Sequence, residues 1–283
     1  MSKGDGRNSC WIEKGVSLDD FVAAMLARGD ELYRDLPWRH VDDPYAVLVS
    51  EIMLQQTQVA RVGRFWERFL SAFPTVDALA AAAVPDVLEL WQGLGYNRRA
   101  LALKRTADRC AAEGAGRLPE TYEGLLALPG YQRPAVYLET NVRSVFLHEL
   151  FPEEEAVSDK VLLPLVEAAA FHPAAAADPR RWYYGLLDYG AHLKATVPNP
   201  SRRSAGHSRQ SAFEGSRRQK RAWITRRVLA APEGVSRAAV LADLNAAELA
   251  SGRPEVDPPL FDSIVADLLT EGFFREENDT LTP

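Results

Sequence analysis

The chain has 283 residues, 47% of them hydrophobic, and a formal net charge of −6 at pH 7. This length allows one large or two small domains with a sizeable core, and no apolar run approaches the roughly 20 residues that a membrane span needs. The polar, glycine-rich residues 1–8 do not resemble a secretion signal, and the two cysteines, Cys10 and Cys110, are too few for a four-cysteine metal site or a disulfide framework, so we expect a cytoplasmic protein without membrane contact.

Most of the chain has apolar residues spaced by three and four, which is typical of amphipathic helices. The expected helices of the first half are Phe21–Tyr33, Ala46–Gln56, Arg61–Phe73, Val76–Ala83, Val84–Gln92, Arg98–Glu113 and Tyr122–Leu128. Proline and glycine residues separate them. Alternating strand patterns are scarce, so the sequence predicts an all-α fold.

Two further helices are expected in the second half, at Lys160–Phe171 and Trp182–Lys194, before a basic run at residues 202–221. Three short helices and a polar, hairpin-like end follow; the helices are Arg221–Ala230, Ser236–Leu249 and Leu260–Glu271. Three helices and a small β-ribbon are the order of a winged-helix unit. We therefore expect a small winged-helix-like domain at the end of the chain.

The negative charge is confined to this end of the chain. Residues 222–283 carry eleven acidic and five basic side chains, whereas residues 1–221 carry 28 of each sign. Because binding of phosphates depends on local potential, a neutral body with a basic stripe can still bind nucleic acid.

Glu51 is the first residue whose surroundings suggest chemistry. It stands beside Ile52, Met53 and Leu54 in an apolar helical segment. A buried carboxyl group has a raised pKa and can remain protonated near neutral pH, which suits a general acid. The residues alone favour the plainer alternative, a glutamate that faces solvent.

Four segments have a distinctive order and spacing. They are Leu36-Pro37-Trp38-Arg39, then Ser50–Gln58 with the letters SEIMLQQTQ, then Phe73-Pro74-Thr75, and Leu94–Ala100 with the letters LGYNRRA. Together they resemble the N-terminal half of adenine glycosylases and of endonuclease III, members of the HhH-GPD superfamily of base-excision DNA glycosylases. The resemblance covers about residues 35–128 and resumes from 135 to about 221. It implies a two-lobed helical fold with a DNA cleft between the lobes.

The resemblance implies roles for the second segment. Glu51 matches the glutamate that protonates the purine and so makes it a better leaving group. Gln56, with Gln55 and Thr57 beside it, matches the loop that fills the hole left by a flipped base, whose unstacking costs a few kcal/mol. The alternative for these three residues is a solvated cap at the end of a helix.

The resemblance also implies a pocket for the flipped base. Trp38 and Arg39 match residues of the pocket wall, which act by stacking and hydrogen bonding. Tyr96 matches a tyrosine that lines the same cleft, although an ordinary half-buried aromatic residue would have the same pattern.

A second catalytic group is expected in Tyr137–Arg143, where the adenine glycosylases carry an aspartate. Glu139 is its counterpart, with one more methylene, and a carboxylate here would stabilise the sugar cation as the base leaves. Asn141 fits an amide that orients this carboxylate or the departing base. A helix N-cap formed by Thr140 or Asn141 is the structural alternative, compatible with the catalytic one.

The segment after Leu128-Pro129-Gly130 departs from the family. About a dozen residues of the hairpin and its following helix are absent, and Gly130 is the remaining glycine that could bind a DNA phosphate through its amide. No lysine stands between Lys104 and Lys160, so a Schiff-base lyase has no obvious nucleophile. We therefore expect a monofunctional enzyme.

The loop after the last barrel-flanking helix is the second departure. Relatives hold an iron–sulfur cluster there with four cysteines, whereas residues 199–221 contain none, so we expect neither cluster nor metal nor other cofactor. The expected phosphate contacts of this basic run are Arg202, Arg203, Arg217, Arg218 and Lys220. A solvated basic loop is the plainer alternative.

The expected domains are a flexible N-terminus at 1–16, a glycosylase domain at 17–221 and a winged-helix-like tail at 222–283. Within the glycosylase domain, a six-helix barrel lobe would span about 45–148, and a second lobe about 17–44 and 149–221.

We expect a monomeric, nucleoid-associated DNA N-glycosylase of base excision repair that removes a flipped mismatched or damaged base, adenine as the first guess, from duplex DNA. The shortened hairpin leaves two alternatives open. One is a catalytically weakened lesion-binding protein whose acidic tail docks a protein partner, and the other is a truncated product that folds poorly.

Overall fold

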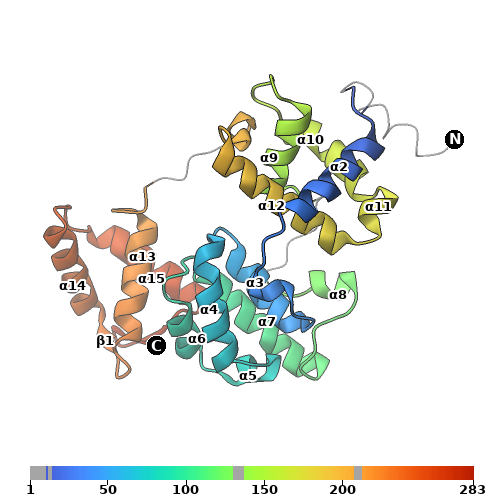
Figure 1. Ribbon diagram of the computed structural model, residues 1–283. Helices are drawn as coiled ribbons and strands as arrows, with labels where there is room; N and C mark the ends of the chain where they lie inside the picture. The colour runs from blue at the N-terminus through green and yellow to red at the C-terminus, as the bar shows by residue number, and fades with distance from the viewer. Residues whose placement is uncertain (1–10, 12–14, 130–136, 207–211) are drawn as a thin grey trace. The chain divides into compact units, whose positions relative to one another are not determined.

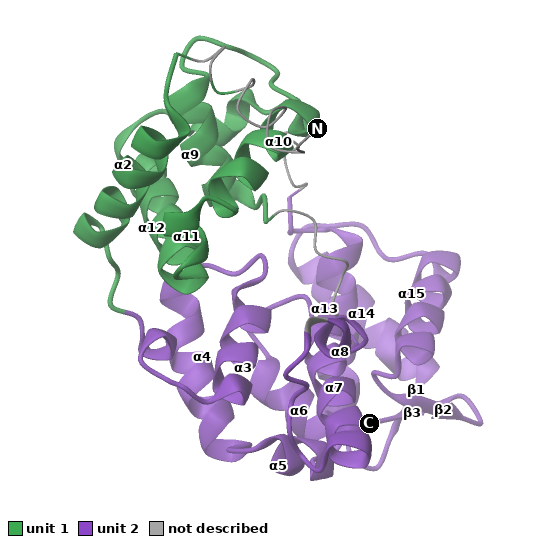
Figure 2. Ribbon diagram, turned by 90° about the vertical axis from the view of Figure 1, so that its right-hand side faces the viewer, with its two compact units in different colours: residues 1–35, 133–210 green, residues 36–132, 211–283 purple. Residues whose placement is uncertain are grey.

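The computed structural model describes residue 11 and residues 15–129, 137–206 and 212–283. These residues are mostly helical, as the sequence predicts. The chain divides into two compact units (Figure 2): unit 1 contains residues 1–35 and 133–210, and unit 2 contains residues 36–132 and 211–283. Within the described part of the chain, no helix is long and apolar enough to cross a membrane.

Unit 1 is a group of helices packed around its longest member, α12 (Figure 1). Its elements are α2 (Leu18–Glu31), α9 (Thr140–Leu150), α10 (Asp159–Ala170), α11 (Pro173–Ala176), α12 (Pro179–Thr196) and the 3-10 turn η2 (Pro200–Arg203). Helix α12 packs against both α2 and α9. At the first contact a Cβ atom on Gly29 would lie 2.6 Å from Cα of Gly185, so only glycine lets these two backbones touch.

The first part of unit 2 is a second helical group, which contains the segments with the distinctive spacing. Its elements are the 3-10 turn η1 (Pro37–Arg39), α3 (Pro44–Leu54), α4 (Val59–Ala72), α5 (Val76–Ala81), α6 (Val84–Trp91), α7 (Arg98–Gly114) and α8 (Tyr122–Leu126). Helix α3 starts after Asp43, whose carboxylate accepts the amide of Tyr45 at 3.0 Å. The buried indole of Trp66 donates to the carbonyl of Ala46 at 2.9 Å and so ties α4 to α3.

The last part of unit 2 has the element order expected of a winged helix: helix, strand, two helices, then two strands. The elements are α13 (Arg217–Leu229), β1 (Val235–Ser236), α14 (Arg237–Ala250), α15 (Pro258–Glu271), β2 (Arg275–Glu277) and β3 (Thr280–Thr282). The strands form one antiparallel sheet in the order β1-β3-β2, in which Leu281 pairs with Val235 on one side and with Glu276 on the other.

This tail differs from the expected module in its start and in its packing. Helix α13 begins at Arg217, four residues after Phe213, because Ser216 caps it by accepting the amide of Gln219. The basic run therefore lies partly inside the helix. Ile224, Val228 and Phe261 belong to the same buried cluster as the residues of α3 to α7, so the tail shares one core with the helical part of unit 2.

Helix α9 also lies in a different group from the one expected. We assigned it to the barrel lobe of residues 45–148, whereas it belongs to unit 1. The reason is its buried face: Val142, Val145 and Phe146 pack in the core of unit 1, where the ring of Phe146 lies 5.1 Å from that of Phe21. Residues 36–44 were expected in the same lobe as α2, whereas they belong to unit 2.

Candidate functional site

Glu51 lies on α3 with its side chain exposed. Its neighbours Ile52 and Met53 are buried, so this turn of the helix has one face in the core and one at the surface. The residues alone favoured a glutamate that faces solvent, and the exposed side chain agrees with that alternative. The apolar letters around Glu51 describe the opposite face of the helix, because successive residues differ by about 100° in direction.

The turn after α3 presents a glutamine at the surface. Gln55 and Gln56 are exposed, and Thr57 is partly buried. Gln56 has φ of 55°, the left-handed conformation that a residue other than glycine adopts at a cost of about 1–2 kcal/mol. A strained, exposed glutamine directly after α3 is the backbone arrangement that a side chain projecting into another molecule requires.

Arg99, on the first turn of α7, binds the end of α3 from the side. Its Nη1 donates to the carbonyls of Ile52 and Met53 at 2.9 Å each, and to that of Gln55. These carbonyls belong to the last turn of a helix, where the backbone leaves acceptors without helical partners. The guanidinium therefore caps α3 at its negative end.

The same guanidinium also binds the loop that precedes α7. Its Nη2 donates to Thr57 Oγ1 at 3.0 Å and to the carbonyl of Gly95 at 2.9 Å, and its carbon lies 5.4 Å from the ring centre of Tyr96. Burial lowers the pKa of Arg99 to about 10, so it remains charged at neutral pH. Arg99 belongs to one of the spaced motifs, but the sequence assigned it no role. It stands directly before the buried Ala100, and no local pattern indicates that it caps α3.

Tyr96 is partly exposed, with 37% of its surface accessible, and has φ of 49°. Its hydroxyl accepts from Arg218 Nη1 at 3.4 Å, a contact between the loop and the tail. Tyr96 is thus at the surface of unit 2 in the loop that Arg99 links to Gln55–Thr57.

Trp38 and Arg39 lie in a different environment from the one expected. Trp38 is 2% exposed and meets Trp66 edge to face, with ring centres 6.2 Å apart. Arg39 is also buried. Trp38 is therefore part of the core of unit 2, and an indole enclosed in this way has no free face on which a base could stack.

Glu139 is the N-cap of α9 in unit 1. Its Oε1 accepts the amides of Asn141 at 2.5 Å and Val142 at 3.1 Å. The sequence indicated Thr140 or Asn141 as the cap. Glu139, the residue before the helix, takes that place, and its carboxylate reaches forward to amides of the first turn that have no partner within the helix. The side chain of Glu139 is partly exposed.

A lysine that sequence analysis did not single out completes this group. Lys194 Nζ, from the last turn of α12, donates to Asn141 Oδ1 at 2.7 Å. The guanidinium of Arg34 repels the ammonium of Lys194 and is itself bound to the buried carboxylate of Asp188 at 2.6 Å. Lys194 stands 53 residues after Asn141, so only the packing of α12 on α9 brings the two together.

Two of the expected phosphate-binding residues lie in the η2 loop and differ in their surroundings. Arg202 is exposed. Arg203 instead binds the carbonyls of Leu147, Phe151 and Pro152 at and beyond the end of α9, with Nη2 3.0 Å from Leu147 O. Arg203 therefore caps α9 at its negative end, and these contacts do not favour its expected role in phosphate binding.

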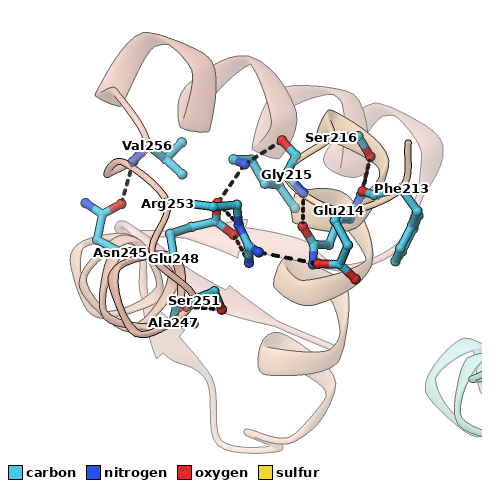
Figure 3. Close-up of polar contacts among 12 residues, drawn as sticks. Phe213, Glu214, Gly215, Ser216, Asn245, Ala247, Glu248, Ser251, Arg253 and Val256 are labelled. Carbon is cyan, nitrogen blue, oxygen red and sulfur yellow. Dashed lines mark hydrogen bonds and ion pairs between the residues drawn. The ribbon is translucent and has the colours of Figure 1, made fainter. Parts of the chain in front are cut away.

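Lys220 and Arg217 are committed to contacts inside the tail. Lys220 is 7% exposed and donates to Glu248 Oε2 at 2.9 Å; Glu248 also binds Arg253, which reaches Glu214 (Figure 3). Arg217 binds Asp267 on α15 at 2.7 Å. Either cation would have to exchange these partners for a phosphate, so their expected role in phosphate binding stays a prediction that the ion pairs do not favour. Arg218, which contacts Tyr96, is partly exposed.

The structure thus groups the expected residues into two sets. Unit 2 brings together Gln55–Thr57 and Tyr96 through Arg99, with Glu51 on the helix that precedes them, and unit 1 brings together Glu139 and Asn141. Gly130 and the shortened hairpin lie outside the described residues. In the described part of the chain, no three His, Cys, Asp or Glu side chains come together as metal ligands, and Cys110 is buried.

Comparison with known proteins identifies the family. A model of the HhH-GPD superfamily of base excision DNA repair proteins matches residues 49–163. An adenine DNA glycosylase of Mycobacterium tuberculosis (strain CDC 1551 / Oshkosh) is 33% identical over 181 residues, which cover 59% of each chain. An adenine DNA glycosylase of Homo sapiens is 41% identical over 122 residues, which cover 40% of this chain and 22% of the relative. The chain therefore spans somewhat more than half the length of the bacterial relative.

The fold agrees with this match. A solved structure of a thermostable thymine-DNA glycosylase superposes with a TM-score of 0.52 at 23% identity, covering 63% of this chain and 88% of that chain. At such identity the likeness concerns the fold alone. Residues 49–163 thus match the HhH-GPD superfamily of base excision DNA repair proteins, and over part of its length the chain is homologous to adenine DNA glycosylases.

Proposed function

We propose that this protein is a monofunctional DNA N-glycosylase that removes a flipped mismatched or damaged base, adenine first, from duplex DNA. One observation carries the proposal. Within the matched segment, the exposed carboxyl group of Glu51 near the end of α3 is followed, in the turn after the helix, by the exposed Gln56 in a left-handed conformation. A base-flipping enzyme needs both a proton donor for the base and a side chain that takes its place in the stack.

Glu51 would protonate the base. Because its side chain is exposed in the free protein, the burial that raises the pKa of a general acid has to come from the bound base and DNA. We therefore expect Glu51 to act as a general acid only when the base and the DNA are correctly bound.

Glu139 would stabilise the sugar cation. Capping of α9 uses Oε1, which leaves Oε2 for the positive charge that develops as the glycosidic bond breaks. Two amide hydrogen bonds to Oε1 hold the carboxyl group in a fixed orientation at the start of α9. Water then adds to the sugar and completes the hydrolysis.

The phosphate contacts of this proposal are fewer than the sequence indicated. From the basic run we keep Arg202, which is exposed, and Arg218, which contacts Tyr96 near the end of α3, whereas Arg203, Arg217 and Lys220 bind carbonyls or carboxylates of the protein. Each contact with a phosphate makes the affinity for DNA more sensitive to salt. The slope of affinity against salt concentration therefore measures the number of contacts.

The test is release of free base from a panel of duplexes with adenine opposite 8-oxoguanine, uracil, hypoxanthine or a T·G mismatch. We expect release from at least one duplex, without a covalent complex after borohydride treatment. A folded protein that binds a lesion duplex tightly but releases nothing would support the alternative function, lesion binding with the acidic tail as a docking site. Borohydride trapping would contradict the monofunctional mechanism.

A further inference from the structure

Lys194 is placed by the close packing of α12 on α9. A Cβ atom on Gly190 would lie 2.7 Å from Cα of Asn141, so glycine at this position lets the two helices approach. One turn further along α12, Lys194 reaches Asn141 and donates from Nζ to Oδ1 at 2.7 Å. The lysine is thus part of the same rigid contact that holds Asn141.

This contact decides which end of the Asn141 amide is free. A lysine ammonium has only donors, so the amide atom that faces it must be the oxygen. The amide nitrogen, with two hydrogens, therefore points away from Lys194. Asn141 is held as a hydrogen-bond donor toward whatever lies at the start of α9.

The charges around Lys194 come from three elements. The ammonium is attracted by Glu139 at the start of α9 and repelled by Arg34, which follows α2 and is itself paired with Asp188 of α12. Burial is the largest influence and lowers the pKa of Lys194 below its ordinary value of 10.5. The amine therefore carries a positive charge at neutral pH that is only partly shielded by water.

We propose that Lys194 is a positioning residue for base excision: its ammonium fixes Asn141 as an outward donor next to the Glu139 carboxylate at the start of α9. The proposal rests on the proposed glycosylase function, because it assigns Lys194 to the carboxylate that stabilises the sugar cation. Lys194 acts through these two neighbours and does not itself bond to the substrate.

The first test compares K194M with K194R and with the control K160M, which alters an exposed lysine of the same unit. In single-turnover and steady-state base release, K194M should lower kcat on the order of 10- to 100-fold with little change in KM, as expected when a catalytic group is displaced by about 1 Å. K194R should restore part of the loss, and K160M should behave as the unaltered protein. Thermal unfolding checks that each variant is folded.

The pH profile separates this role from a purely structural one. The ammonium holds the Asn141 amide in place by a charged hydrogen bond, so the alkaline limb of kcat reports on this contact. In the unaltered protein, kcat should fall as Lys194 loses its proton below pH 10.5, and this limb should vanish in K194M. A reduced kcat with an unchanged pH profile would contradict the proposal.

The second test needs no activity. In the full chain with 13C-labelled lysine, an NMR titration of Lys194 should show that Glu139→Gln lowers its pKa further, because an attractive charge is removed. An unchanged titration overturns the proposal. If the protein releases no base from any duplex, the proposed function fails, and this titration still decides whether Glu139 acts on the ammonium of Lys194 at the start of α9. A borohydride-trapped adduct at Lys194 would make it a nucleophile and would also overturn the proposal.

Discussion

Arg99 shows how one side chain can set the geometry of a site that it does not enter. Its guanidinium has fixed fork geometry with five donors, which suits simultaneous bonding to two loops. It binds the end of α3 and the turn after it at Ile52, Met53, Gln55 and Thr57, and the loop before α7 at Gly95. The position of the exposed Gln56 depends on these bonds, since the residues on both sides of it are held by the same group.

We therefore predict that Arg99→Met lowers the free energy of unfolding by about 2–3 kcal/mol, because several carbonyls lose a charged donor. The matched control is Arg105→Met, an exposed arginine on the same helix, for which a change within about 0.5 kcal/mol is expected. Denaturant unfolding measures both. Equal effects of the two substitutions would show that Arg99 does not have this role.

Gln56 allows stability and DNA binding to be separated. Glycine adopts the φ of 55° without the steric cost of a side chain but adds flexibility to the unfolded chain. Gln56→Gly should therefore change the free energy of unfolding by no more than about 1 kcal/mol. Base release should nevertheless fall strongly, because the side chain that fills the vacated stack is gone. Single-turnover release at unchanged thermal stability is the measurement; undiminished release would rule out Gln56 as the inserted residue.

At the scale of elements, basic residues with the same appearance in the sequence have different functions. Arg202 and Arg203 are adjacent, yet the first is exposed and the second caps α9. Lys220 is buried against Glu248 and fastens α13 to α14. Charge and spacing could not distinguish them, because the partners of Arg203 and Lys220 lie 28 to 56 residues away in the chain.

This assignment predicts how salt affects DNA binding. Arg202→Ala should reduce the slope of log affinity against log salt concentration by about 0.9, the effect of one phosphate contact. Lys220→Met should leave that slope unchanged but lower the free energy of unfolding by about 3 kcal/mol, since it leaves a buried carboxylate with one partner fewer. Binding titrations at several salt concentrations provide the slopes. A reduced slope for Lys220→Met would mean that the lysine binds DNA directly.

The elements themselves were largely predictable. The sequence predicted a helix at Arg98–Glu113, and the structure has α7 at Arg98–Gly114, because apolar spacing and flanking breakers are local signals. The end of a helix is less predictable when its cap is unusual. At α9 the sequence indicated Thr140 or Asn141, whereas the cap is Glu139, a longer side chain that local preferences do not favour.

At the scale of the whole molecule, the sequence predicted the family and the helical class better than the surroundings of individual residues. Motifs with fixed spacing made Glu51, Gln56 and Glu139 candidates, since spacing is a property of the chain, and their roles stay predictions. Burial is a property of packing, so Trp38 and Lys220 had different environments from those expected. Lys194 and Arg99 were missed for the same reason: their partners meet them only in the folded unit.

The acidic tail is also better explained at this scale. Its carboxylates bind arginines of the same unit: Glu271 binds Arg98 of α7 and Arg221 of α13, and Asp267 binds Arg217. Together with the shared core, these pairs make the tail a stabilising part of unit 2. Much of the negative charge from residue 222 onward therefore has partners in the protein.

The central claim is that Glu51 is the acid of a base-excision reaction, and single-turnover base release tests it most directly. The comparison is between the unaltered protein, Glu51→Gln and the control Glu67→Gln, an exposed glutamate on α4 of the same unit. We predict that the unaltered protein and Glu67→Gln release base at similar rates and that Glu51→Gln releases none, while all three bind the lesion duplex. Release by Glu51→Gln at the rate of the unaltered protein would contradict the account.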